Sequence, residues 1–246
     1  MTKINDYRQT LRQLKDWVPY LKKNSGLPGP RGNLELAEAV SEEASKQQIE
    51  EFLSIPSEEA KENTPEVFLV FCGVVSLGKL IAHGDLKQLA RLRTYTSDPR
   101  WRIREAAAIA LQAVGDQDMN ILLQKMQNWM KGSWYEKRAV AVALAEPRLL
   151  KESQTTLKVL KILDKITSEM EAAKDTGDEA LKILRKSLGY CWSVAVAASP
   201  TEGKPFIEKW LTSEDKDIRW IMKENLKKNR LIKMDADWVK ACILKL

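Results

Sequence analysis

The sequence predicts an all-α protein. Apolar residues recur at three- and four-residue spacing along most of the 246 residues, and no segment keeps the strict alternation that marks a half-buried strand. A hydrophobic content of 44% with 30% charged residues is typical of a folded globular chain. A short motif also recurs along the chain, and each copy places a turn between two helical segments.

The chain opens with an amphipathic segment. Residues 3–23 carry apolar side chains at helical spacing, and Pro19 is expected to bend or interrupt this helix. A Gly- and Pro-rich connector follows over residues 25–33. Its last residue, Asn33, can cap a second helix, which we expect to run to about Leu53.

The longest apolar run, residues 67–82, predicts a buried helix. Thr64 and Pro65 suit its start, and Gly84 suits its end. The run is interrupted by small and charged residues and is shorter than the roughly 20 residues that a bilayer needs. We therefore expect no membrane span, and the polar opening MTKINDYRQT is unlike a secretory signal.

The stretch from Tyr95 to Gly115 predicts a turn followed by a buried helix. Asp98 can cap this helix, Pro99 suits its first turn, and Gly115 suits its end. Four alanines leave little side-chain bulk, so we expect a neighbouring helix to approach closely. They are Ala106, Ala107, Ala108 and Ala110.

A repeat begins near Asp85. Residues 95–104, 129–138 and 210–219 each place an aromatic residue nine positions before an arginine, and the first two copies lie 34 residues apart. The aromatic residue is expected late in a first helix and the arginine early in a second one. A weaker fourth copy combines a long helix over 154–174 with a turn at 175–178 and a further helix.

Two further signals lie near the C-terminal end of the sequence. Ser199, Pro200 and Glu202 predict a capping box with proline at the first helical position. Residues 238–244 predict the last helix.

The turn motif resembles the HEAT repeat, in which a capping residue and an arginine open the second helix of each pair. The resemblance covers residues 85–232. It implies a curved right-handed α-solenoid of about five HEAT-like helix pairs, of the armadillo/HEAT superhelix type. We expect a single domain over residues 1–246, with N-terminal helices over 1–84 and repeats over 85–246.

The charge distribution favours a polyanionic partner. The net charge is +6 and the pI about 9.1. Residues 79–138 carry 11 Lys and Arg against 6 Asp and Glu, and residues 204–246 carry 11 against 7, whereas residues 1–63 are slightly acidic. A solvated surface with a modest cationic bias is the alternative.

Several kinds of chemistry are not expected. The chain has one histidine, His83, and three widely spaced cysteines, so neither a metal site nor a disulfide framework is predicted. Without a Gly-rich phosphate loop, no cofactor is expected either. The cysteine usage favours a reducing, cytoplasmic setting.

The second helices carry basic and aromatic side chains that we expect to line one concave surface and to bind a phosphate backbone. The alternatives are structural: Arg104, Arg138 and Arg219 can link neighbouring repeats, and each tryptophan can pack between layers. The predicted binding residues are Arg100, Trp101, Arg102, Trp134, Arg138, Tyr190, Trp192, Arg219, Trp220 and Lys223.

These second helices resemble those of the HEAT-repeat DNA-alkylation-repair glycosylases of the AlkD type. There, a tryptophan with an aspartate four residues later, an arginine on the next repeat and a further aromatic residue line the DNA-facing cleft. The matching positions here are Trp101 with Glu105, then Arg138, then Tyr190 or Trp192. The resemblance implies duplex DNA as the partner.

The same resemblance implies excision of alkylated bases, with Glu105 as the catalytic carboxylate that stabilises positive charge as the glycosidic bond breaks. Glutamate stands here where that family has aspartate, and a solvated carboxylate at a helix start is the structural alternative. Residues 27–37 and 188–198 also resemble bacterial HEAT-repeat proteins to which no activity is attached. A non-enzymatic scaffold that binds a partner protein is therefore the second hypothesis.

Overall fold

A computed structural model describes residues 2–173 and 177–246 of the chain, and in these ranges every regular element is helical. The all-α prediction is confirmed. The chain forms two compact units, unit 1 over Met1–Asp118 and unit 2 over Met119–Leu246.

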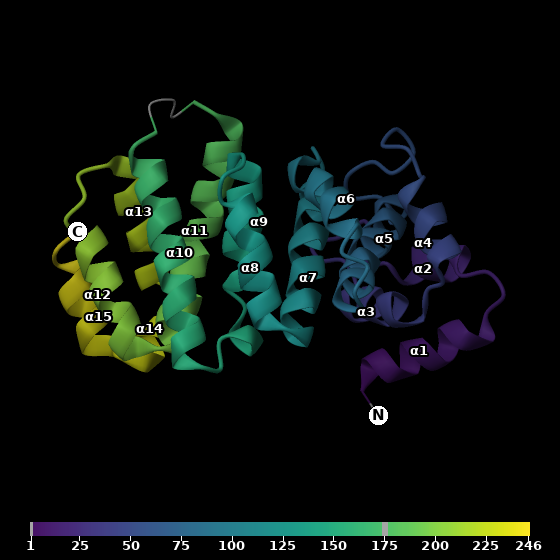
Figure 1. Ribbon diagram of the computed structural model, residues 1–246, viewed down its shortest axis with the longest axis horizontal. Helices are drawn as coiled ribbons and strands as arrows, with labels where there is room; N and C mark the ends of the chain where they lie inside the picture. Colours follow the sequence, from purple (N-terminus) through teal and green to yellow (C-terminus); the bar gives the residue numbers. More distant parts are fainter. Residues whose placement is uncertain (1, 174–176) are drawn as a thin grey trace. The chain divides into compact units, whose positions relative to one another are not determined.

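Unit 1 is built around one apolar helix. This helix, α5, packs against α2, α3, α4, α6 and α7, and Figure 1 shows α3, α4, α6 and α7 around it. The helices of unit 1 are α1 (Lys3–Gln13), α2 (Val18–Asn24), α3 (Leu34–Glu43), α4 (Lys46–Leu53), α5 (Pro65–Ala82), α6 (Gln88–Thr94) and α7 (Trp101–Gln117), with a 3-10 turn at Tyr95–Ser97.

Helix α5 is long and apolar enough to cross a membrane by length and composition alone, but 72% of it is buried inside the fold. It ends as predicted, because His83 caps it and Gly84 follows with a φ of 100°. Its closest neighbour is α7: a Cβ added to Gly78 would lie 2.3 Å from the carbonyl oxygen of Ala110. The prediction that the alanines of α7 admit a close neighbour is confirmed.

Two predicted helices are in fact four. The helix expected over 3–23 ends at Gln13, and α2 begins at Val18 with Pro19 in its first turn, where the missing N–H costs little. The helix expected over 34–53 stops at Glu43, because Ser45 and Gln48 form a capping box that starts α4. Asn33 caps α3 as predicted, through a 3.1 Å bond to the Leu36 amide.

The predicted ends of α7 were wrong. The residue before its first turn is Arg100, and Asp98 accepts a hydrogen bond from the Arg100 amide at 2.8 Å instead of capping the helix. Gly115 lies inside α7, which continues to Gln117. The carboxylate of Asp98 stays outside the helix because it also binds the Arg100 guanidinium.

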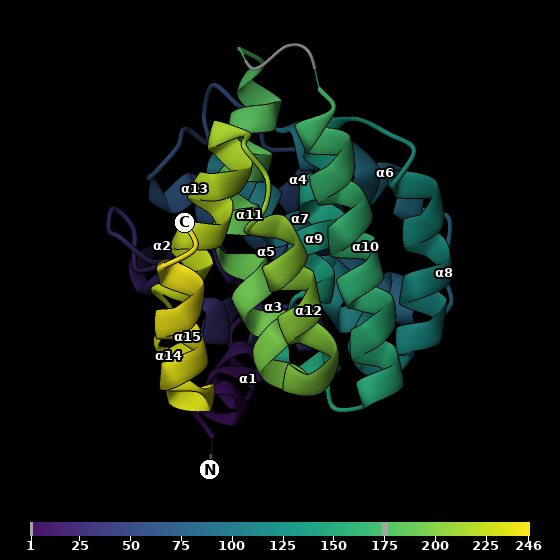
Figure 2. The same ribbon diagram turned by 90° about the vertical axis from the view of Figure 1, so that its left-hand side faces the viewer.

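Unit 2 arranges its helices in two layers. Helices α9, α11 and α13 are neighbours in one layer, while α8, α10 and α12 pack on them from the other side; Figure 2 shows α10 and α12 side by side. The helices are α8 (Met119–Trp129), α9 (Trp134–Leu144), α10 (Ser153–Glu171), α11 (Glu179–Ala198), α12 (Pro200–Trp210), α13 (Lys216–Leu226), α14 (Asn229–Met234) and α15 (Ala236–Ile243), with a 3-10 turn at Pro147–Leu149.

The repeat motif matches the helices of both units. Tyr95 directly follows α6, and Trp129 and Trp210 end α8 and α12. Arg104, Arg138 and Arg219 lie within the first five residues of α7, α9 and α13. In the weaker copy, α10 ends at Glu171, and residues 174–176 of the predicted helix end and turn lie outside the described residues.

The predicted capping box at Ser199 does not form. Pro200 does open α12, but the Ser199 hydroxyl lies 3.1 Å from that of Ser153 and makes no capping bond. The last helix begins two residues earlier than predicted, at Ala236, because Asp235 accepts a hydrogen bond from the Trp238 amide.

A buried asparagine joins two second helices. Asn225 of α13 donates at 2.8 Å to the carbonyl of Leu188 on α11, and it accepts at 2.7 Å from the amide of Ser193. The side chain is fully buried and fully hydrogen-bonded, so it fixes the register between α11 and α13.

Candidate functional site

The predicted site residues fall into two places, one in each unit. Trp101 and Glu105 line a pocket in unit 1. Arg138, Tyr190, Arg219, Trp220 and Lys223 lie in unit 2 on the layer of second helices.

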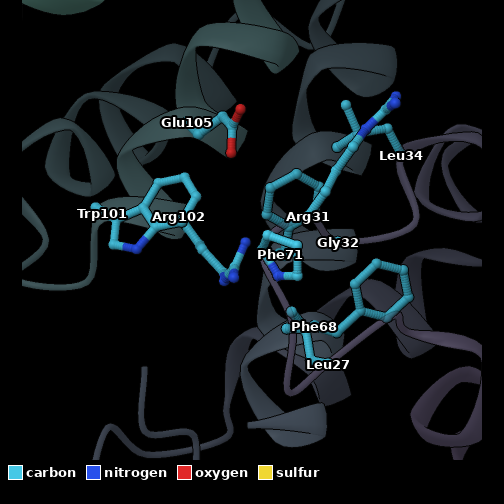
Figure 3. Close-up of a pocket in the computed structure, with 10 residues that line it drawn as sticks. Leu27, Arg31, Gly32, Leu34, Phe68, Phe71, Trp101, Arg102 and Glu105 are labelled. Carbon is cyan, nitrogen blue, oxygen red and sulfur yellow. The ribbon is translucent and has the colours of Figure 1, made fainter. Parts of the chain in front are cut away.

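The pocket of unit 1 is a cavity of about 120 Å³ between α5, α7 and the connector before α3. Figure 3 shows Trp101 and Glu105 on one side of it and Phe71, Phe68 and Arg31 on the other. Trp101 and Glu105 share a side of α7 because they are one turn apart. The lining residues are Leu27, Pro30, Arg31, Gly32, Leu34, Phe68, Phe71, Trp101, Arg102 and Glu105.

Arg102 is a structural residue. It is 4% exposed, its guanidinium carbon lies 4.4 Å from the centroid of the Trp101 ring, and its Nη2 donates at 2.6 Å to the carbonyl of Gly29. Its Nε lies 3.1 Å from a carboxylate oxygen of Glu62. The guanidinium therefore ties two loops to α7, and its contacts within the chain leave little of it exposed.

Arg100 is held in the same way. Its Nε and Nη2 donate to the two carboxylate oxygens of Asp98 at 2.9 and 2.7 Å, and its Nη1 donates to the carbonyl of Ala60. This pairing raises the pKa of Arg100, and the hydrogen bond that Arg100 donates to Asp98 is the largest cause. Arg104 likewise donates to the carbonyls of Asp98 and Pro99 in the turn before its own helix, and these two bonds do not test whether it also links neighbouring repeats.

In unit 2, a basic surface surrounds Tyr190 of α11. The Nε of Arg138 donates at 3.3 Å to the hydroxyl of Ser187, one turn before Tyr190. Arg230 lies over the Tyr190 ring, with its guanidinium carbon 4.6 Å from the ring centroid, and donates to the Tyr190 hydroxyl. Tyr190 remains 45% exposed. We call this surface the α11 surface and define it by Arg138, Arg185, Tyr190, Arg219, Trp220, Lys223 and Arg230.

Cys191, next to Tyr190 on α11, has a buried thiol. Burial raises the pKa of Cys191 to about 12, and the positive charges of Arg138 and Arg230 act against that rise. The thiol is protonated at neutral pH and is no nucleophile.

Trp220 extends the α11 surface onto α13. The Arg185 guanidinium lies 3.8 Å from the centroid of its ring, and the ring edge contacts α11 at Gly189, where a Cβ would lie 3.0 Å from it. Beyond Trp220 is a cavity of about 510 Å³. It is lined by Arg219, Trp220, Lys223, Lys227, Ile243 and Leu246.

Two of the tryptophans predicted to bind nucleic acid, Trp192 and Trp134, make contacts within unit 2. Trp192 is fully buried, and its indole N–H donates to the hydroxyl of Thr167 at 3.1 Å. Its position fits the packing alternative, so Tyr190 is the aromatic residue that the surface offers. Trp134 lies beside Lys137, whose ammonium is 4.6 Å from the ring centroid and donates to the carbonyl of Gly132.

Some residues of the pocket and of the α11 surface were not predicted from the sequence. Phe68 and Phe71 belong to the apolar run that we read only as core, and Arg185 lacks the spacing of the repeat motif. Two apolar residues three positions apart on a helix next to the alanine-rich one were the available signal for the phenylalanines. Within the described ranges, no group of three or more His, Cys, Asp or Glu residues could hold a metal ion.

Comparison of the chain with protein-family models, with curated proteins and with solved structures found no match.

Proposed function

We propose that this protein binds the phosphate backbone of nucleic acid, in the first place duplex DNA, through the α11 surface. The supporting observation is that three side chains of this surface contact α11 within one turn: Arg138 binds Ser187, Arg230 lies over the Tyr190 ring, and Trp220 contacts Gly189. Guanidiniums neutralise phosphates, and a partly exposed aromatic ring offers a face or an edge to a sugar or base.

The predicted superhelix belongs to this proposal. In unit 2, helices α8 to α13 alternate between two layers, as the helix pairs of HEAT-type repeats do. A right-handed solenoid of about five such pairs would continue the layer of second helices into a longer concave surface. The single domain over 1–246 and its cytoplasmic setting stay predictions.

Base excision is the enzymatic form of the proposal, and the pocket of unit 1 favours it. Trp101 and Glu105 line one cavity, Trp101 being 44% exposed. In the reaction the C1′–N bond breaks with its electron pair going to a cationic alkylated base, and water adds to C1′ and loses a proton. The Glu105 carboxylate would stabilise the positive charge that develops on the sugar.

The second candidate function is a scaffold that binds a partner protein. Three apolar side chains near the end of unit 2 favour it, since Ile232, Ile243 and Leu244 are 42%, 50% and 88% exposed. Exposed apolar residues of this kind mark protein interfaces when they form a contiguous patch.

A binding and release assay distinguishes these functions. Labelled duplexes with and without an N-methylated purine are incubated with the protein, and bound DNA and released base are measured separately. The proposal expects binding to both duplexes, and excision additionally expects base release that Glu105→Gln abolishes. Glu38→Gln, at an exposed carboxylate of α3, is the matched control.

Each outcome of this assay supports a different function. Binding without release removes the enzymatic form and keeps the nucleic-acid proposal. Neither binding nor release, together with a partner protein that co-purifies at fixed stoichiometry, supports the scaffold instead.

A further inference from the structure

We propose that the cavity beside α13 in unit 2 binds a free fatty acid, with its carboxylate on the cations of α13 and its alkyl chain on the apolar residues that follow α15. This ligand does not depend on nucleic-acid binding and is tested without DNA. The cavity shares Arg219, Trp220 and Lys223 with the α11 surface, but its ligand is a different one and has a readout of its own.

The cavity has the size of a small-molecule site. Its volume of about 510 Å³ lies within the roughly 300–1,000 Å³ that is typical of ligand pockets. Helix α13 forms one wall and the end of the chain forms the other, and Figure 2 shows these two segments next to each other. Helices α13 and α15 also pack against each other. The cavity therefore lies within one unit, and a small organic molecule fits it.

Helix α13 supplies a cationic wall. Arg219, Lys223 and Lys227 follow one another at four-residue spacing, so they lie on one side of the helix. Among the described residues, those that line the cavity include no Asp or Glu. Leu246 ends the sequence, and even with its α-carboxylate counted the lining carries three cations against one anion. The wall therefore attracts an anion.

The neighbouring carboxylate of Glu224 does not cancel this charge. Lys227 donates to it at 2.5 Å, and this hydrogen bond is the largest cause of the lowered pKa of Glu224. The positive charges of Lys227, Lys228 and Lys223 lower the same pKa further, so one carboxylate serves three lysines. In the part of the chain that the structure describes, Arg219 and Lys223 form no ion pair. Both cations can therefore receive the carboxylate of a ligand.

The opposite wall is apolar. Ile243 and Leu246 line it, and Ile243 is 50% exposed. Arg185 already lies over the Trp220 ring, so an alkyl chain would rest mainly on these two aliphatic residues. Covering them is favourable because apolar surface leaves water. A small anion such as phosphate would use the cations alone, whereas a fatty acid contacts both walls.

Isothermal titration of the full chain with octanoate tests the proposal. Two comparison ligands separate its parts: 1-octanol keeps the chain and lacks the charge, and hexanoate keeps the charge on a shorter chain. Octanoate should bind about fivefold or more tightly than 1-octanol, because only a carboxylate makes charge-assisted hydrogen bonds with Arg219 and Lys223. It should also bind about fivefold or more tightly than hexanoate, because each buried methylene strengthens binding about fourfold.

Two results would overturn the proposal. One is the absence of octanoate binding at millimolar concentration. The other is an affinity for octanoate that equals the affinity for 1-octanol or for hexanoate, because the first equality removes the role of the cations and the second removes the role of the apolar wall.

Variants locate the two walls. Arg219→Gln and Lys223→Gln should each weaken octanoate binding and leave 1-octanol binding unchanged, while Ile243→Ser should weaken both. Lys161→Gln on α10 and Ile232→Ser on α14 replace exposed residues outside the lining and should change neither. Thermal unfolding checks that each variant is folded. Octanoate binding that survives all three cavity variants would place the ligand elsewhere and refute the assignment.

Discussion

Arg230 lies over the ring of Tyr190 with its guanidinium carbon 4.6 Å from the centroid, and it donates a hydrogen bond to the Tyr190 hydroxyl. The pair joins α14 to α11 and keeps a tyrosine that is 45% exposed in a fixed orientation. A cation and an aromatic ring are thus presented together on the α11 surface.

Tyr190 is the residue of this pair that we expect to contact a base or sugar. Tyr190→Ala should weaken binding to the duplex about fivefold or more, because one aromatic contact to nucleic acid contributes roughly 1–3 kcal/mol. Tyr190→Phe keeps the ring and should change the affinity less than about twofold. Fluorescence anisotropy measures both; equal losses in the two variants would mean that the hydroxyl, and not the ring, matters.

Arg102 should act on stability and not on binding. Arg102→Ala removes the bonds to Gly29 and Asn63 and should lower the unfolding free energy by about 1–3 kcal/mol, the usual cost of leaving buried polar groups unpaired. Urea unfolding measures this change. If the variant were instead as stable as wild type and bound DNA less well, the structural role given to Arg102 would be wrong.

Gly78 should not tolerate even a methyl group. In Gly78→Ala the new Cβ would meet backbone atoms of Ala110 at 2.3 and 2.6 Å, so α5 and α7 must move apart. The expected loss is about 2–3 kcal/mol, which exceeds the roughly 1 kcal/mol that alanine gains in helix propensity.

Gly73 on the same helix supplies the control for this close approach. An added Cβ there meets mainly the flexible side chain of Leu53, at 2.9 Å. Gly73→Ala should therefore cost less than Gly78→Ala in thermal and urea unfolding. The reverse order would contradict the packing of α5 against α7.

The sequence predicted the local features better than the long-range ones. Asn33 as a cap, Pro65 at a helix start and the spacing between Trp129 and Arg138 depend on neighbours within ten residues, and each appears in the structure. The interruption expected at Pro19 does occur, between Gln13 and Val18, whereas the break at residues 44–45 was missed because no glycine or proline marks it.

The sequence did not show which of the predicted site residues are exposed and which are buried by contacts within the fold. Arg102 donates a hydrogen bond to Gly29, which is 73 positions away in the sequence. Trp192 donates one to Thr167, which is 25 positions away. Tyr190 and Trp192 are two positions apart on one helix, so only the packing of α11 decides which of them is exposed. Helical periodicity predicts which residues share one side of a helix. The tertiary structure decides which neighbouring element covers that side.

Acid should weaken the attachment of α1 to α3. Hydrogen bonds from Arg12 and Arg8 lower the pKa of Glu43 to about 2, below the ordinary value near 4.5. Because the folded pKa is the lower one, this stabilisation is complete above about pH 4.5 and disappears as the pH falls toward 2.

Glu43→Gln tests this dependence. At pH 7 the variant should lose about 1 kcal/mol of unfolding free energy, a modest value because Arg12 is mostly exposed and solvent screens the pair. As the pH falls through 2, the difference between the variant and wild type should shrink toward zero in urea unfolding. Glu35→Gln, in the longer and exposed pair with Arg31, should show little difference at either pH; a gap that does not shrink as the pH falls would refute the electrostatic origin.

The salt dependence of duplex binding tests the central claim most directly. If the α11 surface neutralises phosphates, the logarithm of the binding constant falls linearly with the logarithm of salt concentration, and Arg138→Ala, Arg219→Ala and Lys223→Ala each reduce that slope by about one. Lys161→Ala, an exposed lysine on the opposite layer in α10, should leave the slope unchanged. An affinity that does not vary with salt, or a slope that these three substitutions leave intact while Lys161→Ala reduces it, would contradict the account.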